Sequence, residues 1–263
     1  MSDDSLPRVL LVGGVDSSGH SGLDADRAAA RAFECEATAV STAATDQDLF
    51  EVRSVEERLL WHREAADALP GASAVKFGLL PGVASIVEAA RIVARSRHGA
   101  AEVPAVVDPV IASSSGYRFW TEREFAWVRD SLLVSGPILT PNLDELAELA
   151  WEDRGSLVGD AERTVRAAER LLEAGVSAVV AKGGHGDPEG PVRDLVLVPG
   201  AAPHWIERER VPGDGIRGSG CRFATALSCA LARGRALPEA AEAAGAYVAS
   251  CIRDGAAGDQ ASR

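Results

Sequence analysis

The sequence has fewer basic than acidic residues, and no stretch of the chain is enriched in basic residues. The 263 residues include 27 Lys and Arg against 39 Asp and Glu, a formal net charge of −12 at pH 7. Nucleic acids and anionic membrane surfaces attract proteins chiefly through clustered positive charge. We therefore expect neither a nucleic acid nor a membrane among the partners of this protein. A small phosphate ligand stays compatible, because backbone dipoles and metal ions can hold it.

Long hydrophobic runs and paired cysteines are also missing. No apolar run approaches the ~20 residues that a transmembrane helix needs, and residues 1–4 are acidic, unlike the start of a secretory leader. The cysteines, at positions 35, 221, 229 and 251, form no C-x-x-C pair, so neither a zinc site nor a disulfide framework is indicated. These features predict a reduced, cytoplasmic protein.

Short apolar segments alternate with helix-like segments along the chain. This alternation predicts an α/β fold, with a mostly parallel sheet and helices on both faces. We expect one domain over residues 1–263, with the first strand ending at Gly13 and a frayed tail at 254–263. The expected strands cover residues 8–12, 38–43, 72–77, 103–108, 138–140, 177–181, 194–198 and 204–210, the last two pairing with each other. The expected helices cover residues 22–33, 55–68, 85–97, 122–133, 142–150, 160–174, 221–233 and 238–253.

The most informative motif is a glycine turn, Gly218-Ser219-Gly220-Cys221, directly before a helix-forming stretch. Its glycines let the backbone close round a bound group, and a helix N-terminus favours an anion there. A thiol at a helix N-terminus has a lowered pKa, so Cys221 is a candidate for a reactive thiolate. The alternative is a structural turn with a small buried thiol, which suits Cys229 better. We favour a phosphate cradle and phosphoryl transfer.

Polar residues that follow two expected strands suggest a cation site. Asp108 leaves one strand, while Asn142 and Glu145 open a helix after the next. The carboxyl ends of parallel strands share one edge of the sheet, where ligands bind in open α/β folds. Magnesium usually binds one or two carboxylates together with waters and substrate phosphates. For Asn142, ordinary capping of the helix is an equal alternative.

Two further loops fall at the same edge. Lys182 could pair with a phosphate and Gly184 could admit a nucleotide, although a tight turn with a solvated lysine is the alternative. Residues 13–22 are rich in glycine and serine and precede a helix with Asp26, which could accept a hydrogen bond from a flat substrate. A plain loop with Asp26 stabilising the helix start is the alternative. Neither G-x-G-x-x-G nor G-x-x-x-x-G-K-[ST] occurs there, so neither a Rossmann nor a P-loop site is supported.

In combination, these motifs resemble a known family. They are Gly14-x-Asp16, Ser18-Gly19, Gly22 and Ala25-Asp26; Val107-Asp108-Pro109-Val110; Thr140-Pro141-Asn142-Leu143-x-Glu145; Lys182-Gly183-Gly184-His185; and Gly218-Ser219-Gly220-Cys221. Their order resembles the hydroxymethylpyrimidine/phosphomethylpyrimidine kinases of the ribokinase-like superfamily. The resemblance spans nearly the whole chain and implies a three-layer αβα sandwich with a mostly parallel central sheet.

The resemblance implies an activity and a set of site residues. The activity is phosphorylation of 4-amino-5-hydroxymethyl-2-methylpyrimidine and then of its monophosphate in thiamine biosynthesis, with ATP and Mg²⁺. The implied substrate contacts are Asp26 and Gln47, with Gly14 and Val110 nearby. The implied nucleotide contacts are Asp108, Asn142, Lys182 and Gly184, and the implied metal ligands are Asp108 and Glu145. The amides of residues 218–221 would form an anion hole, and a Cys221 thiolate of near-neutral pKa would take the hydroxyl proton. We also expect a homodimer.

Several positions depart from the family pattern. Ser114 stands where the family usually has Lys, Asp48 where it has Asn, and Arg217 where it has His. These changes leave open a pyridoxal or pyridoxine kinase of the same superfamily, or only one of the two phosphorylations. A non-catalytic protein that binds the pyrimidine is the alternative from a different class.

Overall fold

A computed structural model describes residues 5–47, 51–98, 102–113, 115–186, 188–212 and 215–261. Asp48 and Ser114, two of the departures from the family pattern, lie outside the described residues. One sheet of nine strands runs through the molecule in the order β3-β2-β1-β4-β5-β6-β7-β8-β9. The strands are β1 (Arg8–Asp16), β2 (Glu36–Gln47), β3 (Val52–Glu57), β4 (Ala74–Phe77), β5 (Ala105–Val107), β6 (Ile138–Leu139), β7 (Ala178–Ala181), β8 (Val192–Leu197) and β9 (His204–Arg208).

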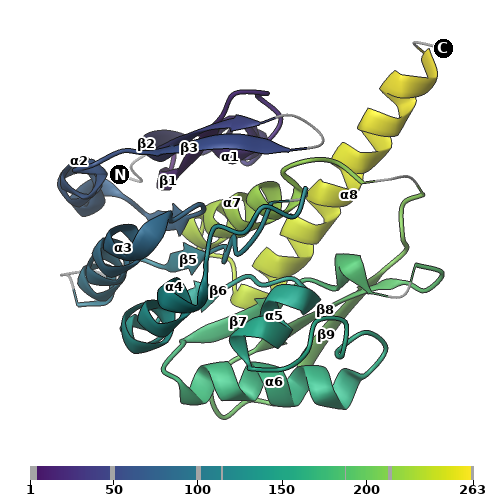
Figure 1. Cartoon of the computed structure of the whole chain (residues 1–263). Helices are drawn as coiled ribbons and strands as arrows, with labels where there is room; N and C mark the ends of the chain where they lie inside the picture. Colours follow the sequence, from purple (N-terminus) through teal and green to yellow (C-terminus); the bar gives the residue numbers. More distant parts are fainter. Residues whose placement is uncertain are drawn as a thin grey trace.

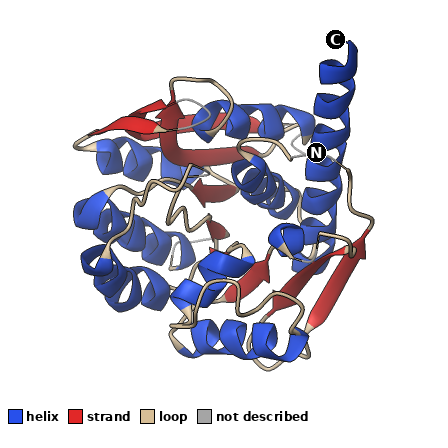
Figure 2. Cartoon of the chain, turned by 45° about the vertical axis from the view of Figure 1, so that its right-hand side comes forward, coloured by secondary structure: helices blue, strands red, loops and turns tan. Residues whose placement is uncertain are grey.

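The sheet is parallel from β2 to β7 and antiparallel at both ends. β3 runs against β2, and β8 and β9 continue antiparallel from β7. The described helices are α1 (Gly22–Ala32), α2 (Trp61–Ala68), α3 (Gly82–Arg97), α4 (Glu122–Trp127), α5 (Leu143–Leu149), α6 (Ala161–Glu173), α7 (Ser219–Ala232) and α8 (Leu237–Ala261). Figures 1 and 2 show helices on both faces of the sheet, which confirms the expected α/β sandwich.

Side-chain alternation along the strands sends residues to hydrophobic clusters on opposite faces of the sheet. In β1, Leu10 and Val12 belong to the core under α2 to α6, whereas Val9 and Leu11 pack with residues of α1 and α7. Neighbouring side chains of a strand point to opposite faces, so a sheet covered on both sides needs apolar residues at nearly every position. This requirement explains why the strands were readable in the sequence as short apolar runs.

Two expected boundaries in the first half of the chain were wrong. The helix expected over residues 55–68 contains only α2, because residues 52–57 form β3 and pair with β2. Leu60, with φ of 67°, turns the chain between them. β1 does not end at Gly13 but continues to Asp16, with a shift of pairing register between Gly13 and Gly14. Pairing with a neighbouring strand overrides a helical pattern, and glycine inside a strand often marks such an irregularity.

Helices in the second half also differ from the expected ones. The stretch expected as a helix over 122–133 begins as α4 but changes to a π-helix at Val128–Leu132 and a 3₁₀-helix at Leu133–Ser135. α8 spans Leu237–Ala261 and is therefore longer than the helix expected over residues 238–253. Elongation adds one hydrogen bond per residue fixed, so a helix already formed can continue through weak helix formers.

Candidate active site

The sequence-derived site residues all line one cavity, of about 470 Å³, at the carboxyl edge of the parallel strands. Loops after β1, β5, β6 and β7 reach it, together with the start of α7. The predicted residues that line it are Gly14, Asp26, Gln47, Val110, Asp108, Asn142, Glu145, Lys182, Gly184, Gly218, Ser219, Gly220 and Cys221. The fold thus brings together residues that are more than 200 positions apart, while their individual roles stay predictions.

The glycine turn forms the N-terminus of α7. Gly218 is the capping residue with φ of 70°, and a Cβ at this position would lie 2.8 Å from the carbonyl oxygen of His20. Only glycine fits such a left-handed backbone in so little space. The first intrahelical bond is donated by the N–H of Arg222 to the oxygen of Gly218, at 2.9 Å. The N–H groups of residues 218–221 therefore precede the hydrogen-bonded ladder and offer donors to an anion.

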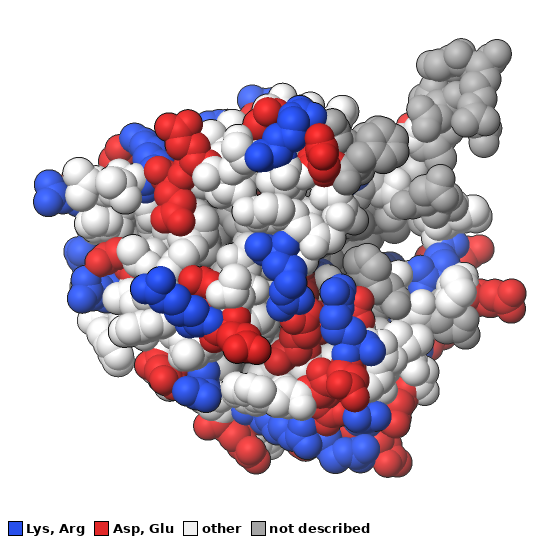
Figure 3. Space-filling model, viewed as in Figure 1, with Lys and Arg blue, Asp and Glu red and all other residues white. Residues whose placement is uncertain are grey.

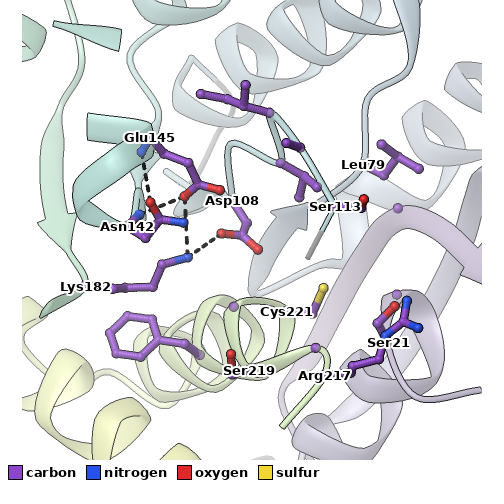
Figure 4. Close-up of a pocket in the computed structure, with 18 of the residues that line it drawn as sticks. Ser21, Leu79, Asp108, Ser113, Asn142, Glu145, Lys182, Arg217, Ser219 and Cys221 are labelled. Atoms are coloured by element: carbon purple, nitrogen blue, oxygen red, sulfur yellow. Dashed lines mark hydrogen bonds and ion pairs between the residues drawn. The ribbon is translucent and has the colours of Figure 1, made fainter. Parts of the chain in front are cut away.

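A cluster of three charged side chains faces this helix N-terminus (Figure 4). Lys182 Nζ lies 2.7 Å from Asp108 Oδ1 and 4.0 Å from Glu145 Oε2. A Cβ on Gly220 would lie 3.3 Å from both Asp108 Oδ2 and Lys182 Nζ. The anion-binding amides and the charged cluster therefore border the same small volume, which suits a phosphate group between them.

Burial controls the charges in this cluster. Burial raises the pKa of Glu145 to about 7, opposed by Lys182 and reinforced by the nearby carboxylate of Asp108. Burial would lower the pKa of Lys182, but Asp108 and Glu145 outweigh it and raise the pKa above its usual value. One buried ammonium thus serves two carboxylates, and the cluster is short of positive charge.

Asn142 caps α5, the structural alternative considered from the sequence. Its side-chain oxygen accepts from the N–H of Glu145 at 2.8 Å, and Glu145 Oε2 accepts from the N–H of Asn142 at 2.7 Å. This reciprocal capping box fixes both side chains at the edge of the cavity. The side-chain nitrogen of Asn142, Nδ2, takes no part in the two hydrogen bonds of the cap, so a ligand contact is compatible with capping.

The carboxylates present fit a magnesium ion that shares its coordination with phosphate. Among the residues that the structure describes, no three His, Cys, Asp or Glu side chains gather closely enough to hold a metal. Asp108 and Glu145 provide two carboxylates on either side of the Lys182 ammonium in the cavity. Mg²⁺ commonly takes one or two carboxylates and completes its shell with waters and substrate phosphates. A dication would also supply the positive charge that the cluster lacks.

The floor of the cavity holds a buried ion pair that the sequence analysis missed. Lys76 Nζ, on β4, donates to Asp26 Oδ1 at 2.9 Å and to Oδ2 at 2.8 Å, and Thr225 Oγ1 of α7 donates to Oδ1 at 2.8 Å. The side chains of Lys76 and Asp26 are 1% and 0% exposed. The available signal was a lysine inside an otherwise apolar four-residue strand, because buried lysine is rare unless it is paired.

The Cys221 thiol is not activated in the way that the sequence suggested. A lowered pKa was expected at the helix N-terminus, but burial raises the pKa of Cys221 to about 11. Lys76 and the N–H of Gly22 favour the thiolate, whereas the carboxylates of Asp26 and Asp108 oppose it. The expectation was wrong because loss of solvation and two nearby anions outweigh the helix end.

A second unforeseen network orders the loop over the cavity. Asp16, at the end of β1, accepts from Ser21 Oγ at 2.5 Å and from Ser18 Oγ at 2.8 Å. Arg217 Nη2 lies 3.8 Å from Asp16 Oδ2, which ties this loop to the start of α7. The turn Gly14-x-Asp16 was visible in the sequence, but the partner, some 200 residues away, was not.

Comparison with known proteins agrees with this geometry. The family model for phosphomethylpyrimidine kinase matches residues 16–262. A hydroxymethylpyrimidine/phosphomethylpyrimidine kinase of Streptomyces coelicolor is 35% identical over 254 residues, covering 95% of this chain and 90% of the relative. The phosphomethylpyrimidine kinase of Clostridium difficile superposes with a TM-score of 0.76 at 25% identity, covering 94% of this chain and 99% of that one. Pyridoxal kinase of Staphylococcus aureus, solved in complex with ADP, gives a TM-score of 0.82 at 26% identity, covering 94% and 88%.

The sheet, its two helical layers and the cavity at its carboxyl edge define a phosphotransferase of the ribokinase-like fold. Within that class, the chain belongs to the phosphomethylpyrimidine kinase family. The family and the fold predicted from the motifs are both confirmed.

Proposed function

We propose that this protein uses ATP to phosphorylate 4-amino-5-hydroxymethyl-2-methylpyrimidine and then its monophosphate, as a step in thiamine biosynthesis. The observation that carries the proposal is the pairing of the α7 N-terminus with the Asp108, Lys182 and Glu145 cluster across one cavity, in a chain of this kinase family. Phosphoryl transfer asks a protein mainly for positioning and for charge stabilisation. Both requirements are met by side chains held on strand ends and by a helix terminus.

In the first reaction, the substrate hydroxyl oxygen forms a bond to the γ-phosphorus of ATP. The bond from that phosphorus to the β–γ bridging oxygen breaks, and its electron pair leaves with ADP. The hydroxyl proton passes to the Cys221 thiolate, which is the minor form of this thiol near pH 7 because burial raises its pKa. Amides of residues 218–221 stabilise the charge that develops on the transferred group, and Lys182 adds a cation beside it.

Asp108 and Glu145 would hold a magnesium ion at the nucleotide phosphates, in keeping with their carboxylate chemistry. Bound there, the ion neutralises phosphate charge and polarises the transferred group. Asn142 and Gly184 would border the nucleotide. Asp26, from the cavity floor, and Gln47 would contact the pyrimidine, with Gly14 and Val110 nearby.

We further propose that the chain acts as one kinase domain, as a homodimer in the cytoplasm where ATP is available. No helix among the described residues is long and apolar enough to cross a membrane. On the face shown in Figure 3, acidic and basic side chains are interspersed, in keeping with a small-molecule substrate.

The main competing substrate is pyridoxal, because the S. aureus enzyme of the same fold is a pyridoxal kinase solved with that ligand, at a TM-score of 0.82. ADP release should be measured with the hydroxymethylpyrimidine, its monophosphate, pyridoxal and pyridoxine. Because the chain belongs to the phosphomethylpyrimidine kinase family, we expect the two pyrimidines to have the highest kcat/KM. The ratio of kcat/KM values between two substrates measures the specificity of the enzyme. A higher value for pyridoxal would overturn the proposed substrate, and no ADP release with any of them would overturn the proposed activity.

The role of the thiol has its own test. Cys221→Ala should lower kcat by about 10²–10⁴-fold, the usual contribution of a positioned base. Cys229→Ala, at a buried position away from the cavity, is the control for folding and should keep its activity. Normal turnover by Cys221→Ala would exclude the thiol as base.

A further inference from the structure

Lys76, which forms a buried ion pair with Asp26 in the cavity floor, has no role in the reaction proposed above. Both side chains line the cavity that Cys221 also lines. Both are almost completely buried, so their charges do not serve to keep the protein soluble. Replacing a buried ion pair with apolar residues is often neutral or stabilising, so stability alone does not account for such a pair. A charge pair beneath a reacting group can instead control that group.

Helix α7 connects the pair to Cys221. Thr225, whose hydroxyl donates to Asp26 at 2.8 Å, lies four residues after Cys221 in the same helix. Side chains at positions i and i+4 lie on one helix face, so Cys221 stands one turn above the hydroxyl that holds Asp26. Lys76 comes from β4 and Asp26 from α1, and both elements pack against α7.

We propose that Lys76 is a positioning residue that stabilises the Cys221 thiolate, and that Asp26 is the counter-ion that fixes Lys76 and limits its effect. The ammonium is held by two hydrogen bonds to one carboxylate, so its place in the cavity that Cys221 also lines is fixed before any substrate binds. The inference rests on the proposed role of Cys221 in phosphoryl transfer.

The charged groups around the thiol set the direction of each effect. Lys76 approaches from β4 and Asp26 from α1, while Asp108 follows β5 and Lys182 follows β7. Removing the Asp26 charge takes away an anion that opposes the thiolate, while Asp108 still favours the charged form of Lys76. Removing the Lys76 charge leaves an anion that disfavours it. The two neutralising substitutions should therefore act on Cys221 in opposite directions.

The test is the rate at which iodoacetamide alkylates Cys221 between pH 7.5 and 9.5 without substrates, followed by mass spectrometry of its peptide. A charge change this close shifts a thiol pKa by about one unit, which is about tenfold in alkylation rate below the pKa. We expect Asp26→Asn to accelerate alkylation about tenfold and Lys76→Met to slow it about tenfold. The double variant, which removes both charges, should fall between them.

Controls separate this electrostatic effect from loosened packing. Cys251, which is partly exposed on α8, reports the intrinsic reaction in every sample and should not change. Thr225→Val removes a hydrogen bond to Asp26 without changing charge and should change the rate less than threefold. If Lys76→Met does not fold, the alkylation rates of Asp26→Asn and the double variant still test the inference. Thermal unfolding shows which variants are folded.

Acceleration by both Asp26→Asn and Lys76→Met would overturn the inference, because opening of the structure exposes the thiol in either case. A Cys221 rate within twofold of the parent in folded Asp26→Asn would overturn it as well. If alkylation responds as expected but Cys221→Ala turns over substrate normally, the inference stands and the proposed base does not. The two failures are thus distinguishable.

Discussion

Asp16 shows how a single carboxylate is kept charged inside the active-site loop. Burial alone would raise its pKa, but hydrogen bonds from Ser21 and Ser18 outweigh burial and lower it. A carboxyl with a lowered pKa in the folded state stabilises that state above its unfolded pKa of about 3.9. This contribution disappears as the pH falls through the folded-state pKa.

Asp16→Asn should therefore lower the free energy of unfolding by about 1–2 kcal/mol at pH 7, the usual value of hydrogen bonds to a charged group. The difference from the parent should shrink as the pH falls below about 4. Urea unfolding from pH 7 to pH 3.5 measures it. Asp24→Asn, which removes an exposed pair with Arg27, is the control and should change stability little. A pH-independent loss in Asp16→Asn would contradict the explanation.

The two glycines of the turn, Gly218 and Gly220, should differ in how substitution by alanine affects stability and activity. A Cβ on Gly220 meets Asp108 Oδ2 and Lys182 Nζ at 3.3 Å, in the volume assigned to phosphate. Gly220→Ala should fold with little loss of stability and lower kcat/KM by at least about 100-fold, because the methyl group displaces the transferred phosphate. Gly218→Ala should instead cost at least about 1–2 kcal/mol, since its φ is 70° and its Cβ would lie 2.8 Å from the carbonyl oxygen of His20. Thermal unfolding and ADP release, measured on both variants, compare them, and full activity in Gly220→Ala would contradict the assignment.

At this scale, the sequence predicted the residues that reach the cavity but not the pairs they form. Asp26, Asp108 and Lys182 were recognisable because each follows or faces a strand end. The partner Lys76 was not recognised, since its neighbours in the sequence are buried strand residues and its charge is balanced only across the fold. The protonation of Cys221 was misjudged for the same reason: the local helix end was visible, and the distant carboxylates were not.

The N-terminus of helix α5 contributes both to the stability of the helix and to the lining of the cavity. Its capping box joins Asn142 and Glu145, which both border the cavity. Aspartate caps a helix as well as asparagine does, so Asn142→Asp should keep the stability of the parent. Asn142→Ala should lose about 1 kcal/mol.

The same pair of variants tests whether Asn142 borders the nucleotide. Asn142→Asp adds an anion beside the phosphates, so we expect KM for ATP to rise about tenfold while stability is kept. Unfolding in urea and ATP saturation curves provide the two measurements. An unchanged KM in Asn142→Asp would limit this residue to capping.

Strands were predicted best where their side chains are buried on both faces of the sheet. They were predicted worst where the strand conformation depends on pairing with a neighbouring strand. The apolar runs of β4, β5 and β7 identified those strands directly. β3 has largely exposed side chains and no such run, so its residues were joined to α2. Its strand character comes from pairing with β2, information that no local window of sequence contains.

For the whole molecule, the proposed homodimer can be tested by mass. Light scattering should give twice the 27.4 kDa of one chain. Leu59, just beyond the edge strand β3, is 79% exposed, the highest value among the large hydrophobic side chains described. Exposed apolar groups beside a free edge are suited to contact between chains. Leu59→Lys should therefore raise the dissociation constant at least tenfold, and a monomeric parent would contradict the proposal.

Helices α7 and α8 follow all nine strands of the described sheet in the sequence, so they are synthesised after them. Val106 and Val180 lie in the sheet interior, and their covering partners, such as Phe223 and Ala240, belong to these last two helices. A nascent chain that ends before Ser219 contains all nine described strands but leaves Val106 and Val180 uncovered on one face of the sheet. In such a chain Asp26 also lacks the hydroxyl of Thr225. The cavity can thus form only after α7, whose first residues line it, has been synthesised. Chaperone binding to the ribosome-bound chain should accordingly persist until α7 has emerged and then cease.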